Sequence, residues 1–135
     1  MDQYSLMVKG VVRHEGKYLV VQRWYDDCIS TNPYRYGFCD GRVQYPEGPD
    51  AAVLRIVKEA TGLDVTITKC MYTWSFMSGD ICNVGIAYEC ASEDEEVVLS
   101  EELSDYQWVE GSELGKYIED KKILYDLEKA QDIEI

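Results

Sequence analysis

A loop that runs directly into a helix limits the possible folds of this chain more than any other segment. It occupies residues 41–63, GRVQYPEGPDAAVLRIVKEATGL. Pro49 suits the first turn of a helix, Asp50 would lie near the positive end of the helix dipole, and Gly62 suits the C-terminal cap. We therefore predict a helix over residues 49–61.

The flanking segments predict strands, because β-branched runs alternate with turn residues. A hairpin is expected around HEGK at residues 14–17, with Gly16 at the position that takes a positive φ. Two long strands are expected around SGD at residues 78–80, and a further strand enters a short helix within residues 106–118. A short strand is also expected at residues 97–99.

Two more segments complete the element order. Residues 25–37, YDDCISTNPYRYG, predict a polar loop, and a loop of that length in a small domain is often functional. Residues 121–133 predict a closing amphipathic helix. The resulting order places the chain in the α+β class, with a mixed β-sheet packed between helices. Its 135 residues, 46% of them hydrophobic, predict a single domain over residues 1–135.

The charge of the chain restricts its partners. A net charge of −13 repels nucleic-acid backbones, so binding to DNA or RNA is not expected. A small phosphorylated ligand is compatible with this charge only where a divalent metal ion or converging Lys and Arg side chains neutralise it locally.

The sequence also limits the expected cellular location of the protein and the metal sites that it could form. The start, MDQYSLMVKG, lacks the features of a signal peptide, and no stretch approaches the ~18 apolar residues of a membrane span, so we expect a cytoplasmic protein without a membrane partner. The 5 cysteines form no CxxC pair and there is 1 histidine, so neither a zinc site nor a Cys-His catalytic pair is expected. The thiols are expected to be reduced and mostly buried.

At residues 41–63 the chain resembles the Nudix superfamily. The family's box reads Gly, five residues, Glu, seven residues, then Arg-Glu-apolar-any-Glu-Glu-any-Gly-apolar. The positions that agree are Gly41, Glu47, Arg55, Val57, Glu59, Gly62 and Leu63. Ile56 and Ala60 stand where the family has glutamates. The flanking segments YGFCDGRV and SEELSDYQWVEGSEL fit the family as well, and the resemblance implies a Nudix-like α/β/α sandwich.

The resemblance also implies a reaction, the metal-dependent attack of water on a nucleoside diphosphate that is linked to another group. Mg²⁺ or Mn²⁺ would serve, held by oxygen ligands. On the helix face that would hold the metal, only Glu59 keeps its carboxylate. We expect Glu59 and Glu47 to be the remaining metal ligands and Glu102 to act with Glu59 as a catalytic residue, if the site is active. The losses at positions 56 and 60 predict that hydrolysis is weak or absent.

The retained box positions also have a structural interpretation. Gly41 would permit a tight loop, and Glu47 would pair with Arg55 across the junction between loop and helix. Arg55 would also reach Glu59 one turn along the helix, and Gly62 would end it. We interpret Gly41, Arg55 and Gly62 as residues that specify the fold.

Ligand contacts are predicted outside the box. In so acidic a chain, Arg23, Arg35 and Arg42 are the candidate phosphate-binding cations, with surface charge balance as the alternative. Tyr36 is the candidate for stacking on a base or sugar. Its aromatic neighbours Trp24, Tyr25, Tyr34 and Tyr45 are weaker candidates of the same kind. Trp74, Phe76 and Trp108 are expected to pack in the core.

Three hypotheses about function remain open from the sequence. The first is a pyrophosphohydrolase with a rebuilt metal site. The second is a non-catalytic sensor that binds a nucleotide or sugar phosphate through aromatic residues and arginines. The third is a protein-interaction module, and a homodimer is possible. Specificity would reside in loops outside the box, here residues 24–36 and 91–105.

Overall fold

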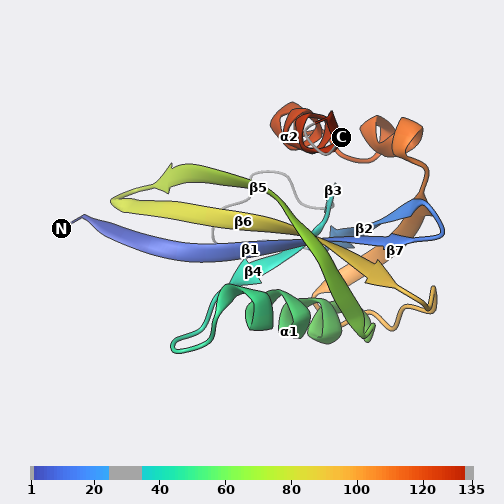
Figure 1. The fold of residues 1–135 in the computed structure, drawn as a ribbon, viewed down its shortest axis with the longest axis horizontal. Helices are drawn as coiled ribbons and strands as arrows, with labels where there is room; N and C mark the ends of the chain where they lie inside the picture. Colours follow the sequence, from blue (N-terminus) through green and yellow to red (C-terminus); the bar gives the residue numbers. More distant parts are fainter. Residues whose placement is uncertain (1, 25–34, 133–135) are drawn as a thin grey trace.

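A mixed β-sheet separates the two long helices of the chain. The computed structural model describes residues 2–24 and 35–132. α1 (Pro49–Thr61) covers one face of the sheet, while the 3-10 helix η1 (Gly111–Lys116) and α2 (Lys121–Asp132) lie on the other (Figure 1). The strands are β1 (Gln3–His14), β2 (Lys17–Arg23), β3 (Tyr36–Gly37), β4 (Cys39–Arg42), β5 (Val65–Ser78), β6 (Ile81–Ser92) and β7 (Leu103–Val109). The predicted fold class is confirmed.

β1 organises the sheet. The main path runs β3-β2-β1-β6-β5, with β4 paired to β1 and β7 paired to β2. β1 is parallel to β6 and antiparallel to β2 and β4. The register Gly10↔Cys39 and Val8↔Gly41 brings β4 beside the middle of β1, directly before the loop that enters α1. This pairing places the start of the box segment against the sheet.

Local sequence signals fixed the turns. The hairpin between β1 and β2 turns at Glu15 and Gly16, with φ of 49° and 81°. α1 begins at Pro49 and ends before Gly62, whose φ is 76° and whose amide donates to the Lys58 carbonyl at 2.9 Å. Both turns use the left-handed region, which glycine enters without a Cβ clash. The predicted helix bounds of 49–61 are confirmed.

Each face of the sheet carries its own hydrophobic cluster. On the α1 face, Val53 and Val57 are fully buried against β1. On the face of η1 and α2, Tyr18, Ile118 and Leu127 form the second cluster. The order of packing is therefore helix, sheet, helix, as the family resemblance implied.

The prediction of a strand at residues 97–99 is wrong. This segment instead runs past the C-terminal end of α1, where Val98 and Ser100 donate to the carbonyls of Thr61 and Ala60 at 2.9 and 3.0 Å. The last carbonyls of a helix have no partner within the helix, so they accept these amides in place of a neighbouring strand.

Two burial predictions need correction. Phe76 is 39% exposed, so it is not a core residue, whereas Trp74 and Trp108 are partly buried. Cys39 and Cys90 are buried, but Cys70 is exposed. Phe76 lies in β5, at the edge of the sheet, and Cys70 is in the same strand, where fewer neighbours cover a side chain.

Most of the predicted loop at 25–37, including Cys28, lies outside the described residues. Within the described part of the chain, no helix is long and apolar enough to cross a membrane.

Candidate functional site

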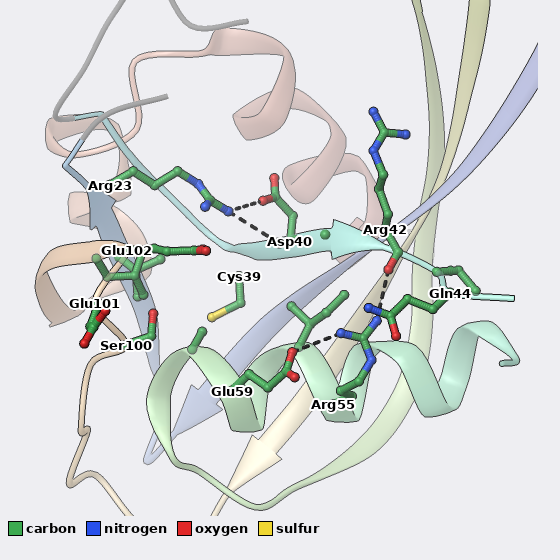
Figure 2. A pocket seen from close by; sticks show the side chains of 16 residues that line it. Arg23, Cys39, Asp40, Arg42, Gln44, Arg55, Glu59, Ser100, Glu101 and Glu102 are labelled. Carbon is green, nitrogen blue, oxygen red and sulfur yellow. Dashed lines mark hydrogen bonds and ion pairs between the residues drawn. The ribbon is translucent and has the colours of Figure 1, made fainter. Parts of the chain in front are cut away.

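A cleft of about 830 Å³ opens between β4, α1 and the turn before β7 (Figure 2). β4 supplies one wall, α1 supplies the floor, and the turn faces them from the other side. Its lining residues are Val21, Arg23, Cys39, Asp40, Gly41, Arg42, Val43, Gln44, Arg55, Ile56, Glu59, Ala60, Ser100, Glu101, Glu102 and Leu103. The cleft therefore joins the box segment to residues about 50 positions further along the chain, at 100–103.

Ile56 forms the apolar floor of this cleft. Its side chain is 8% exposed and belongs to the buried cluster under α1. A Cβ built on Gly41 would lie 2.8 Å from Cδ1 of Ile56, closer than van der Waals contact allows. Gly41 lies in β4 with no positive φ. The close approach of Ile56 therefore explains this glycine, not the tight loop that the sequence suggested.

Glu47 and Arg55 lock the loop onto α1, as predicted. Arg55 donates from Nε and Nη2 to the two carboxylate oxygens of Glu47 at 2.9 and 2.8 Å. It also donates to Glu59 at 3.0 Å and to the Arg42 carbonyl at 3.0 Å, while the Gln44 amide donates to Glu47 at 2.9 Å. One guanidinium thus connects a loop carboxylate, a helix carboxylate and the Arg42 carbonyl, which favours a single shape of the loop.

These bonds shift the ionisation of the pair. The hydrogen bonds from Arg55, and then from the Gln44 amide, lower the pKa of Glu47 to about 2. The same contact raises the pKa of Arg55 above its already high value. Both groups therefore stay charged through the physiological range.

The Glu47 pair predicts an acid-sensitive contribution to stability. Because folding lowers the pKa of Glu47 from 4.5 to about 2, the contribution is complete above pH 4.5 and is lost as the pH falls toward 2. Glu47→Gln should therefore have a lower free energy of unfolding than wild type at neutral pH, and this difference should disappear as the pH falls toward 2. Urea unfolding at a series of pH values measures the difference.

The control for that series is Glu101→Gln, which removes a carboxylate at an exposed position of the turn. Its stability should follow the wild type at every pH. A gap between wild type and Glu47→Gln that stays constant down to about pH 2 would contradict the prediction.

The side chains in place do not form a ligand set for Mg²⁺ or Mn²⁺. Across residues 2–24 and 35–132, no three His, Cys, Asp or Glu side chains come together to hold a metal ion. Glu59 points to Arg55, and Glu47 is bound to the same guanidinium and does not line the cleft. A hard cation needs several free oxygen ligands. Metal ligation by Glu59 and Glu47 stays a prediction, and in this structure both carboxylates accept from Arg55.

Glu102 lies on the turn across the cleft from α1. Its carbonyl accepts from the Trp24 amide at 3.3 Å, and its side chain is exposed. Figure 2 shows Glu101 and Glu102 on the opposite side of the cleft from Arg55. The structure thus brings Glu102 and Glu59 to the same cleft, although from different walls.

The three predicted phosphate-binding arginines do not converge. Arg23 lines the cleft and donates to Asp40 at 2.7 Å. The guanidinium of Arg42 is directed away from α1 and binds Ser5 and Asn83 (Figure 2). Arg35 lies outside the cleft lining, 3.6 Å from Glu119. The candidate cations of the cleft wall are therefore already paired within the chain.

Tyr36 lies on the η1 side of the sheet, away from the cleft lining. Its hydroxyl donates to Asp105 at 2.6 Å, and its ring meets Tyr117 edge to face. The hydrogen bond to Asp105 raises the pKa of Tyr36 to about 12 and lowers the pKa of Asp105. Tyr36 thus packs against the second hydrophobic cluster in this structure. Trp24 and Tyr45 are exposed, while Tyr25 and Tyr34 lie outside the described residues.

Sequence reasoning missed Cys39 and Ser100 as parts of the cleft. Cys39 is buried, and burial raises the pKa of its thiol to about 12, so it lines the cleft as a neutral group. Ser100 reaches the cleft because its amide binds the end of α1. No local sequence signal marks either residue, since both positions depend on pairing with distant segments.

Comparisons with known proteins agree with this geometry. The chain is 24% identical over 123 residues to nucleoside triphosphatase NudI of Klebsiella pneumoniae, covering 82% of this chain and 85% of the relative. Its fold is similar to the MutT protein of Methanosarcina mazei, with a TM-score of 0.82, 21% identity, and coverage of 97% of this chain and 95% of that one.

A further similar fold is the Ap4A hydrolase of C. elegans, with a TM-score of 0.80, 18% identity and 96% of each chain covered. The Nudix domain of Shewanella oneidensis NrtR, solved with ADP ribose, has a TM-score of 0.75, 16% identity, and coverage of 96% and 89%. The family model described as NUDIX domain matches residues 4–127. The chain therefore belongs to the Nudix family.

Proposed function

We propose that this chain binds a nucleotide-like phosphorylated ligand in its cleft and that metal-dependent hydrolysis there is weak or lost. One observation carries the proposal. Ile56, buried against Gly41, occupies the floor where the family's box has a glutamate, and the neighbouring Glu59 is paired with Arg55. With only one carboxylate left on this face of α1, a divalent metal has few ligands there.

The size of the cleft supports ligand binding. About 830 Å³ lies within the range of small-molecule sites, roughly 300–1,000 Å³. The relatives with similar sequences are named nucleoside triphosphatases, and a similar fold was solved with ADP ribose. These similarities favour a ligand that joins a nucleotide to a second group.

Such a ligand meets a cleft of mixed charge. Carboxylate side chains line it from Asp40, Glu59, Glu101 and Glu102, against the guanidinium groups of Arg23 and Arg55. Arg23 contacts Asp40 through Nη2, and its guanidinium could bind a phosphate in addition to Asp40 or in its place. Binding of this kind does not depend on a metal ion, so a chelator should leave it unchanged.

The test is turnover of a mixed panel of nucleoside di- and triphosphates, dinucleotides and nucleotide sugars with Mg²⁺ and with Mn²⁺. Products are identified by mass, and binding of the same panel is measured with and without chelator. The proposal expects chelator-insensitive binding and turnover no greater than that of Glu59→Gln. Fast turnover that Glu59→Gln abolishes would overturn it.

That second outcome would establish the alternative, a hydrolase with a rebuilt metal site. Glu102 favours it, because this carboxylate faces the same cleft as Glu59. In this alternative Glu59 and Glu47 would hold the metal ion, and Glu102 would act as the base for water. Homodimer formation and a cytoplasmic location are predictions from the sequence that accompany either function.

A further inference from the structure

A second cavity, of about 320 Å³, lies on the α2 side of the sheet. Apolar groups from β1, β5 and α2 form its walls, and charged groups surround its mouth. The lining residues are Met7, Lys9, Asp40, Trp74, Ser75, Phe76, Asp120, Lys122, Ile123 and Asp126. Only Asp40 is shared with the cleft beside α1.

A buried amine lies in the wall of this cavity. Lys9 is 6% exposed, and its Nζ lies 4.4 Å from the centre of the Trp74 ring. Its one hydrogen-bond partner among the described residues is the Tyr72 hydroxyl, at 3.1 Å. No carboxylate of the described chain forms an ion pair with it, which is unusual for a lysine at this depth.

Trp74 holds the amine in place. Its ring lies across β6 over Gly85, where a Cβ would come within 2.4 Å of the ring. A Cβ at this position would collide with the indole ring, which reaches Lys9 on β1. The ring then covers Lys9 on a side that water would otherwise occupy.

Charged groups around Lys9 come from each neighbouring element. Asp40 on β4 is bound by Arg23, and Asp126 on α2 is bound by Lys122 at 3.1 Å. Asp120 accepts from the Lys122 amide at 2.9 Å. Burial lowers the pKa of Lys9, and the three aspartates offset this only in part. A larger share of neutral amine is therefore available at Lys9 than at an exposed lysine.

We propose that this cavity is a covalent binding site for small uncharged aldehydes or ketones, which Lys9 captures as an imine. The apolar walls accept the body of such a ligand. The aspartates at the mouth disfavour an anionic ligand, and they stabilise the positive charge of a protonated imine. This inference is independent of the function proposed for the cleft beside α1.

The chemistry needs no further reactant. The lone pair of the neutral Lys9 amine forms the C–N bond as the carbonyl π bond breaks, which gives a carbinolamine. The carbonyl oxygen then leaves as water with both hydrogens of the amine, and a C=N bond replaces the C–O bond without oxidation or reduction. Burial raises the pKa of Tyr72, so its hydroxyl stays protonated 3.1 Å from Nζ and can donate to the departing oxygen.

The experiment is reductive trapping of the folded protein with benzaldehyde and sodium cyanoborohydride at neutral pH, followed by peptide mapping. Lys122, at the mouth of the same cavity with a side chain 67% exposed, is the matched internal control. Lys9 should be benzylated at least about tenfold faster than Lys122, because the neutral amine is the nucleophile. The ratio of the labelling rate at Lys9 to that at Lys122 should fall as the pH rises toward the ordinary pKa of lysine.

One variant refines the result. Tyr72→Phe should slow trapping at Lys9 while labelling at Lys122 stays constant. Labelling of Lys9 no faster than Lys122 in the wild-type protein would overturn the proposal without requiring any variant to fold. A ratio that does not change with pH would overturn it as well.

Discussion

Replacing Ile56 and Ala60 together by glutamate is expected to strengthen Mn²⁺ binding in the cleft. Both positions line the cleft on the side of α1 where Glu59 lies. Glu59 and Ala60 follow Ile56 by three and four residues, the spacings at which side chains share one helix face. The double variant would place three carboxylates together. We expect Mn²⁺ affinity at least about tenfold above wild type, which corresponds to about 1.4 kcal/mol.

The matched control adds the same charge elsewhere on α1. Ala51 and Leu54 are exposed and do not line the cleft, so Ala51→Glu with Leu54→Glu changes net charge without adding ligands. Calorimetric titration with Mn²⁺ measures both variants, and circular dichroism confirms their folding. Equal Mn²⁺ affinity in the two double variants would show that charge alone, and not a metal site, was gained.

The second large effect is expected at Gly10, where β1 lies against α1. A Cβ at this position would lie 2.8 Å from Cγ2 of Val57 and 3.2 Å from Cγ2 of Val53. Both valines are fully buried and cannot move into solvent. Gly10→Ala should lower the free energy of unfolding by about 1–3 kcal/mol, the usual cost of overpacking a core.

A compensating change makes this prediction specific. Val57→Ala alone leaves a cavity, yet in combination with Gly10→Ala it removes the clash, so the two effects should be non-additive. Gly37→Ala is the control, because a Cβ there meets no atom within 4 Å. Urea unfolding of the wild type, Gly10→Ala, Val57→Ala and their double variant measures the coupling free energy between the two positions. Strict additivity of the two substitutions would contradict the proposed contact.

The helix of the box was predictable because its signals are local. Pro49 and Gly62 act through their own backbone conformations, and the spacing from Glu47 to Arg55 places two complementary charges one loop apart. The strand predicted at 97–99 failed for the opposite reason. Its residues have strand propensity, but the unpaired carbonyls of α1 offered closer partners.

The partners of the arginines could not be predicted. Arg23 pairs with Asp40, and Arg35 lies beside Glu119, far away in the sequence. In a chain with 26 acidic residues, composition cannot say which carboxylate is near which cation. The placement of Tyr36 against Tyr117 depends equally on where η1 packs.

The family and the missing carboxylates at positions 56 and 60 were predictable, because both depend on the spacing of residues within one short segment, 41–63. The folded structure was needed to show that Ile56 packs on Gly41, that Arg55 binds Glu47 and Glu59 together, and that Lys9 is buried beside Trp74. Local backbone preferences act over a few residues, whereas ion pairs and burial depend on which distant strands the sheet brings together.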